Sequence, residues 1–218
     1  MQYLTNLFRA LDLGSLRDMG IRLVSVLLCL TIHEASHGLA AYALGDPTAK
    51  RQHRLSLNPI RHIDWFGFAM LAVAGFGWAK PVPVNPGYFK KPKMGMAITA
   101  LAGPLSNLLL SILLLFLLKI LYYGDLLSQL SLDFLVRASL LSIGLGVFNL
   151  IPIPPLDGSK ILFSVLPDRP YQLLMQYERY GIIVLLVLVM TGAGGGYLSR
   201  LIYGVFSLFC RMVGLSVF

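Results

Sequence analysis

The sequence predicts an all-α membrane protein, a polytopic bundle of about four to five transmembrane helices with a re-entrant or interfacial hairpin between the first two. Composition is the first observation, because 56% of the 218 residues are hydrophobic and only 13% are charged, against about 25% in soluble domains. The mean hydropathy of +0.73 is the second. The third is a series of uncharged stretches long enough to cross a bilayer. These observations exclude a water-soluble globule and a disordered chain.

The charge of the chain fits the same class. The formal net charge is +8, but in a membrane protein the placement of basic residues along the chain matters more than their sum. The basic pI therefore indicates no nucleic-acid partner, and the lipid bilayer is the predicted surrounding. The two cysteines, Cys29 and Cys210, lie far apart in apolar stretches, so no disulfide framework is indicated.

Residues 23–45 form the first predicted span. This segment contains no Lys, Arg or Asp, but it carries His33, Glu34 and His37 near its middle. The residues before it, up to about residue 20, mix leucines with charged side chains, a pattern typical of an interfacial amphipathic helix.

Residues 46–93 form a long connection with eight Lys or Arg residues against two Asp residues. By the positive-inside rule, we expect this connection and the access to any buried site to be cytoplasmic. Within it, residues 65–79 are uncharged but too short and glycine-rich for a span, and residues 80–86 contain three prolines. This part favours a re-entrant or interfacial hairpin.

The remaining spans follow from uncharged stretches. Residues 94–118 form the second, residues 138–156 the third and residues 180–199 the fourth, whereas residues 197–218 are apolar but broken by arginines and glycines, which leaves a fifth span open. The third ends in a run that includes Pro152, Pro154 and Pro155, which stops a helix. Without repeats or linkers, we expect one integral membrane domain over residues 1–218, with a core at about 20–165 and C-terminal helices at 177–218.

The strongest chemical motif is His33-Glu34-Ala-Ser-His37, which matches H-E-x-x-H. On a helix, positions i and i+4 place both imidazoles on one face, where they can bind one zinc ion while the adjacent Glu34 polarises a water molecule. Charged groups at the bilayer centre cost about 2.5–3.5 kcal/mol each on insertion scales, so they are rarely there without a partner. The alternative is a pair of core histidines that bond neighbouring helices.

Catalytic zinc usually takes three protein ligands, and Asp157 is the candidate for the third. It follows the prolines that end the third span, where the backbone must line protein or water rather than lipid, and Gly158 allows a close approach. The alternative for Asp157 is an N-cap of the next helix. The weaker candidates for the third ligand are His53, His62, Asp64 and Cys29, of which the two histidines are expected to be solvated loop residues.

Two amides at membrane depth also need partners. Asn107 follows Gly103-Pro104, which loosens the second span, and it could donate to a substrate carbonyl near the metal or bond two helices together. For Asn149, interhelical or backbone hydrogen bonding is favoured.

These motifs lie on successive hydrophobic segments, and the chain resembles the site-2 protease family of intramembrane zinc metalloproteases over residues 20–165. The resemblance is carried by H-E-x-x-H at 33–37, G-P-x-x-N at 103–107 and N-x-x-P-x-P-P-x-D-G at 149–158. The loop at 54–64 and the segment at 77–86 are similar to the compact prokaryotic branch. No stretch is left over for a PDZ or CBS domain.

The resemblance implies one Zn²⁺ per chain, held by His33, His37 and Asp157, with Glu34 as general base and then general acid. Asn107 would match the family's Asn near the scissile carbonyl. The implied substrates are transmembrane segments of other proteins, cut within or near the bilayer of the cell membrane. No oligomeric state is predicted.

Two alternatives come from other functional classes. A membrane metal transporter could pass an ion between paired His and Asp side chains, although it has no evident need for Glu34 and the chain shows no inverted repeat. A catalytically silent membrane scaffold could keep the metal only for folding. Glu34→Gln separates them, since it should abolish peptidase activity while zinc stays bound.

Overall fold

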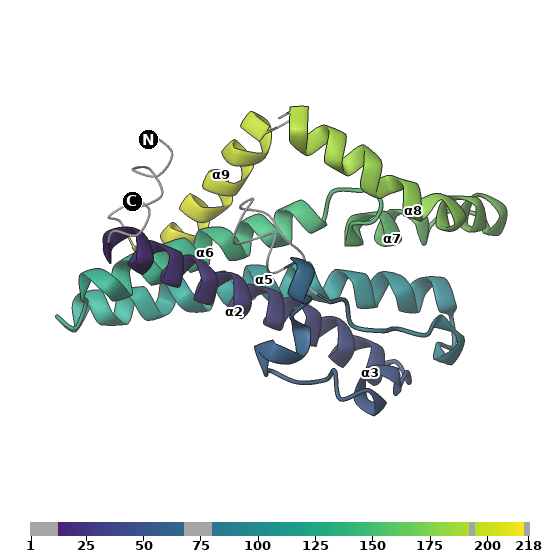
Figure 1. The fold of residues 1–218 in the computed structure, drawn as a ribbon, viewed down its shortest axis with the longest axis horizontal. Coiled ribbons are helices and arrows are strands. Elements are labelled where there is room, and N and C mark those ends of the chain that lie inside the picture. The colour runs from purple at the N-terminus through teal and green to yellow at the C-terminus, as the bar shows by residue number, and fades with distance from the viewer. Residues whose placement is uncertain (1–12, 68–79, 192–194, 216–218) are drawn as a thin grey trace, which may run out of the picture.

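The computed structural model describes residues 13–67, 80–191 and 195–215, and Figure 1 shows their arrangement. Within these ranges the chain contains helices and no strand, which confirms the all-α class. The helices in chain order are α2 (Leu13–Ala43), α3 (Thr48–Arg51), η1 (Pro59–His62), η2 (Pro86–Tyr88), α5 (Pro92–Tyr123), α6 (Gln129–Asn149), α7 (Asp157–Phe163), α8 (Asp168–Thr191) and α9 (Gly195–Val213).

Three helices form the centre of the molecule, and all three are long and apolar enough to cross a membrane. They are α2, α5 and α6, which lie side by side in Figure 1 and contact one another. A short turn after Gly124 joins α5 to α6, and the Ser128 side chain caps α6 by accepting from the backbone N–H of Ser131. Such a short connection makes α5 and α6 antiparallel neighbours.

The first and third spans differ from the predicted bounds. Residues 13–20 are the first turns of α2, not a separate interfacial helix, and residues 1–12 lie outside the described residues. The charges near this end of α2 pair with charges of α6, Arg17 with Asp133 and Asp18 with Arg137. This pairing lets α2 and α6 extend together beyond their uncharged parts. At its other end α6 stops at Asn149, before the prolines.

The predicted fourth span over residues 180–199 is not one helix. Its residues are divided between α8, which ends at Thr191, and α9, which begins at Gly195, and the two run in different directions in Figure 1. The glycine-rich sequence between them has low helix propensity. Neither helix is among the three candidate spans of the described chain.

The apolar core lies between α5, α6 and α9. Leu115, Leu118, Ile143 and Cys210 are almost fully buried there, and α9 packs against both longer helices. The helix α2 also buries polar side chains, which are Ser25, Thr31, His33 and His37. Most of the predicted hairpin, residues 68–79, lies outside the described residues, so the hairpin stays a prediction.

Candidate active site

Three metal-ligating side chains converge where α2 meets the start of α7. His33 and His37 lie one turn apart on α2, and their Nε2 atoms are 3.0 Å apart. Asp157, the first residue of α7, places Oδ2 3.1 Å from Nε2 of His33 and 3.2 Å from Nε2 of His37. All three residues are buried, and theirs is the one cluster of potential metal ligands that the described residues form.

The outer nitrogen of each imidazole is occupied by an oxygen of α5. Nδ1 of His33 lies 2.7 Å from Oδ1 of Asn107, and Nδ1 of His37 lies 2.7 Å from the carbonyl oxygen of Thr99. A carbonyl oxygen only accepts, so each Nδ1 carries the proton and each Nε2 presents a lone pair. This arrangement is typical of metal-binding histidines, whose second nitrogen is tied to an oxygen that fixes the ring.

The donor set fits a divalent metal. The Oδ2 atom of Asp157 is buried and has no hydrogen-bond donor among the described residues. Two nitrogen lone pairs and a carboxylate oxygen thus face one another at about 3 Å, which a single cation satisfies. Two imidazoles and a carboxylate are ligands that suit zinc.

A glycine of α5 makes room for the two imidazoles. A Cβ atom on Gly103 would lie 2.5 Å from Nε2 of His37 and 2.7 Å from Cε1 of His33. Gly103 is buried, and α5 continues as a helix through Pro104. The Gly-Pro pair therefore does not break the second span; the glycine allows α2 and α5 to approach at the site.

The alternatives for the metal ligands are not supported. Asp157 does not cap α7, because Leu156 occupies the N-cap position and no side-chain cap bond forms there. Cys29 directs Sγ toward the carbonyl oxygen of Ala138 at 3.6 Å. His62 was expected to be solvated, but it is buried, and its Nε2 lies 2.7 Å from the carbonyl oxygen of Ser56. His53 is exposed, as expected.

A cavity of about 360 Å³ is lined in part by these three residues. Glu34 lines it, and its Oε2 accepts a hydrogen bond of 2.8 Å from the backbone N–H of Val82. Asn149 also lines the cavity, at the last residue of α6. The described parts of α2, α5, α6, α7 and the connection between α2 and α5 thus meet around one polar space.

The two amides make hydrogen bonds of the kinds that the sequence left open, between helices for Asn107 and to the backbone for Asn149. Asn107 is fully buried: its Oδ1 faces His33, and its Nδ2 donates to the Cys29 carbonyl at 3.1 Å and to Ser142 Oγ at 3.2 Å. Asn149, in contrast, lies at the cavity, and among the described residues it donates only to the carbonyl of Leu145 one turn back in its own helix. In the sequence, the one signal for a role of Asn149 at the cavity was its position at the end of a span just before the prolines.

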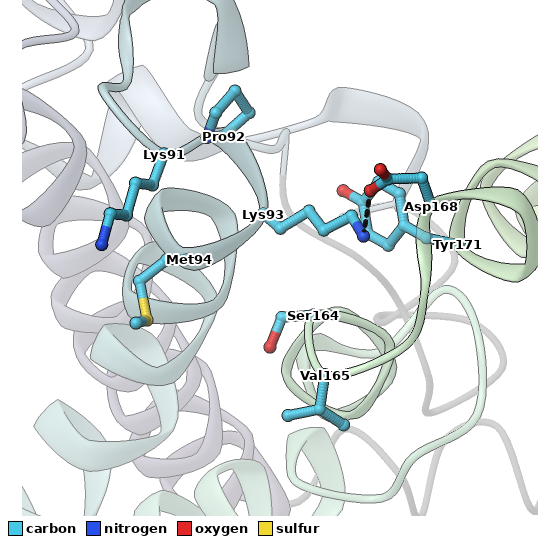
Figure 2. Close-up of a pocket in the computed structure, with 8 residues that line it drawn as sticks. All are labelled: Lys91, Pro92, Lys93, Met94, Ser164, Val165, Asp168 and Tyr171. Atoms are coloured by element: carbon cyan, nitrogen blue, oxygen red, sulfur yellow. Dashed lines mark ion pairs between the residues drawn. The ribbon is translucent and has the colours of Figure 1, made fainter.

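A second, larger cavity of about 570 Å³ is lined by residues at the beginning of α5, just after α7 and at the beginning of α8. Figure 2 shows that Lys93 of α5 reaches across to Asp168 at the start of α8, and its ammonium also donates to the Leu166 carbonyl. The lining is mainly apolar and includes Met94, Val165 and Tyr171. Among the described residues, the cluster of potential metal ligands lines the smaller cavity.

Comparison with known proteins agrees with this geometry. The protein named "Putative zinc metalloprotease YwhC" of Bacillus subtilis is 43% identical over 176 residues, which cover 78% of this chain and 80% of that protein. The chain belongs to the site-2 protease family, peptidase family M50. The model of Peptidase family M50 itself matches residues 118–192, which include Asp157.

A more distant site-2 protease relative extends the match. "Putative zinc metalloprotease Rip2" of Mycolicibacterium smegmatis is 29% identical over 188 residues, which cover 83% of this chain and 70% of that protein. No solved structure matches the chain. Family membership makes the protein a multi-pass intramembrane metalloprotease with zinc as its cofactor.

Proposed function

We propose that this site-2 protease hydrolyses peptide bonds in transmembrane segments of other membrane proteins, with zinc held by His33, His37 and Asp157. The observation that carries the ligand assignment is the convergence of two Nε2 atoms and one carboxylate oxygen at 3.0–3.2 Å in a buried position. When bound there, zinc would supply Lewis-acid polarisation and lower the pKa of water. One domain over residues 1–218 would carry this chemistry.

Glu34 is the proposed general base. It follows the first ligand directly, and it lies at the cavity rather than in the ligand cluster. The bond from Val82 occupies Oε2, and Oε1 accepts no hydrogen bond from the described residues, so Oε1 is available to take a proton from the attacking water. The same oxygen would then return a proton to the leaving amine.

The amide that would contact the scissile carbonyl is Asn149 in our proposal, whereas Asn107 orients His33. The Nδ2 group of Asn149 lies at the cavity and is bonded only to its own helix, so a side-chain rotation could direct it toward a developing oxyanion. The amide of Asn107 has no such freedom, since three partners hold it.

The site lies toward the basic connection. Thr99, near the beginning of α5, contacts His37, near the end of α2, so both meet at the side from which residues 46–91 extend. We propose that this side is cytoplasmic, because of its basic residues, and that water and substrate reach the zinc from there. The predicted hairpin would pair with an unwound substrate, as strand edges do.

The testing experiment measures zinc per chain and cleavage of a transmembrane peptide by the purified full-length protein. The variants are His33→Ala, His37→Ala, Asp157→Ala and Glu34→Gln. We expect zinc to be lost or weakened in the three ligand variants and kept in Glu34→Gln, with cleavage absent in all four. If the zinc-loaded wild type cleaves the peptide and Glu34→Gln still cleaves it, the proposed role of Glu34 is overturned. Undiminished zinc in Asp157→Ala would overturn Asp157 as the third ligand.

A further inference from the structure

The segment Lys80–Asn85 forms one wall of the active-site cavity, and its sequence keeps it extended. Proline at 81 and 83 fixes φ, and each residue that precedes a proline is confined to extended conformations, which applies to Lys80, Val82 and Asn85. Pro81, Val82 and Val84 line the same cavity as Glu34. This backbone is therefore presented directly to the reacting groups.

The middle of the segment holds the proposed general base. The backbone N–H of Val82 donates to Oε2 of Glu34 at 2.8 Å. Hydrogen bonds from N–H groups to carboxylates are stronger than those between neutral groups, so this bond fixes the direction of the carboxylate. Pro81 and Pro83 have no backbone N–H, so Val82 supplies the N–H closest to this point of the cavity wall. The position of Glu34 therefore depends on where the segment lies.

A buried arginine fixes one end of the segment. Arg54 is only 8% exposed, and its guanidinium donates to the carbonyl oxygens of Lys80, Pro81 and Arg61. The N–H of Lys80 adds a bond of 2.9 Å to the carbonyl of His62. A planar guanidinium with several donors suits the task of holding neighbouring carbonyls in one geometry.

A buried aspartate fixes the other end. Asp46, three residues after the end of α2, is fully buried, and its Oδ2 accepts from the N–H of Asn85 at 2.7 Å. Its Oδ1 accepts from the N–H of Thr48 at 2.9 Å, so the carboxylate joins the segment to the first turn of α3. Burial of a charge is costly unless hydrogen bonds compensate it, and here both oxygens are used.

We propose that Arg54 and Asp46 are positioning residues, which hold Lys80–Asn85 at its two ends so that the Val82 N–H keeps Glu34 aligned for proton transfer. The proposal rests on the proposed function of Glu34. A role in folding alone would predict loss of stability or of zinc. Positioning instead predicts a loss in kcat while zinc content and KM change little, because the bond acts on the reacting group rather than on the metal or on substrate binding.

The first test uses Arg54→Met and Asp46→Ala in the purified full-length protein, with zinc content, thermal stability, kcat and KM measured on one transmembrane peptide. We expect kcat to fall about 10- to 100-fold, as small displacements of reacting groups do, with one zinc per chain and KM within about threefold of wild type. Arg54→Lys and Asp46→Asn should recover part of kcat, since Lys still donates and the Asn oxygen still accepts. Arg51→Met, a change at an exposed arginine nearby, is the matched control.

The second test removes the central bond itself. Val82→Pro lacks the N–H that reaches Glu34 and keeps the extended sequence, so it should lower kcat as Arg54→Met does and keep zinc. If Arg54 acts through this bond, the double variant Arg54→Met/Val82→Pro should have a kcat no lower than that of either single variant.

Three outcomes overturn the proposal: wild-type kcat in Arg54→Met and Asp46→Ala, wild-type kcat in Val82→Pro, or fully additive losses in the double variant. If the Arg54 and Asp46 variants fail to fold, the Val82→Pro result decides. A failure of the proposed function is distinct, because Glu34→Gln would then cleave the peptide as the zinc-loaded wild type does.

Discussion

The side-chain oxygen of Asn107 lies 2.7 Å from Nδ1 of His33, and the same amide donates to Ser142, whose hydroxyl bonds back to the Asn107 carbonyl at 2.7 Å. This closed set of bonds fixes which way the amide faces, and with it the orientation of the His33 ring. The helix α5 thus orients His33, a candidate metal ligand on α2.

Replacement of Asn107 by Ala should weaken zinc binding about 10- to 100-fold, the usual effect of losing the partner of a metal-bound histidine. Zinc affinity is measured by competition with a chelator, in parallel with kcat at saturating zinc. Ser142→Ala should weaken zinc less, because the bonds to His33 and Cys29 remain. Unchanged zinc affinity with a strongly reduced kcat would instead place Asn107 at the substrate.

Gly103→Ala should remove zinc from the protein. Its Cβ would lie 2.5–2.7 Å from both imidazoles, closer than atoms approach, so one ring must leave its position. Gly144→Ala is the control, because its Cβ would meet only Ile202 at an ordinary 3.6 Å on another core helix. Metal analysis and thermal unfolding of both variants check this. Full zinc occupancy in Gly103→Ala would mean that α2 and α5 can separate at little cost.

Asn149→Ala should lower kcat about 100- to 1,000-fold, the effect of removing one donor to an oxyanion, with zinc binding unchanged. Its amide lies at the cavity but outside the group of candidate metal ligands. Asn149→Asp, of nearly equal shape, should be equally defective because a carboxylate cannot donate. Full activity of either variant would show that the amide serves only its bond to Leu145.

The candidate metal ligands were predictable because each has a local signal. His33 and His37 are one helical turn apart in sequence, and Asp157 follows prolines that must end a span. The roles of Asn107 and Asn149 could not be assigned in the same way, since both are amides at membrane depth. Which of them reaches the cavity depends on how α5 and α6 pack against α2, and no local pattern records that.

The burial of two charged residues in the connection after α2 could not be predicted. Asp46 and Arg54 belong to a basic stretch of sequence, and both are buried because they bond backbone groups far away in sequence. The start of α2 was predicted to be interfacial, since Arg17 and Asp18 reveal nothing of their partners on α6. Such pairings between distant segments are visible only in the folded chain.

The orientation in the membrane can be tested with single cysteines at two exposed leucines. Leu57 lies in the basic connection, and Leu126 lies in the turn between α5 and α6, at the opposite end of α5; both are about 70% exposed. In intact cells, a membrane-impermeant thiol reagent should label Leu126→Cys and leave Leu57→Cys unlabelled until the membrane is opened. The native Cys29 and Cys210 are fully buried, so they should contribute little background. The reverse labelling would place the basic connection outside, and the zinc site would then be reached from the external face.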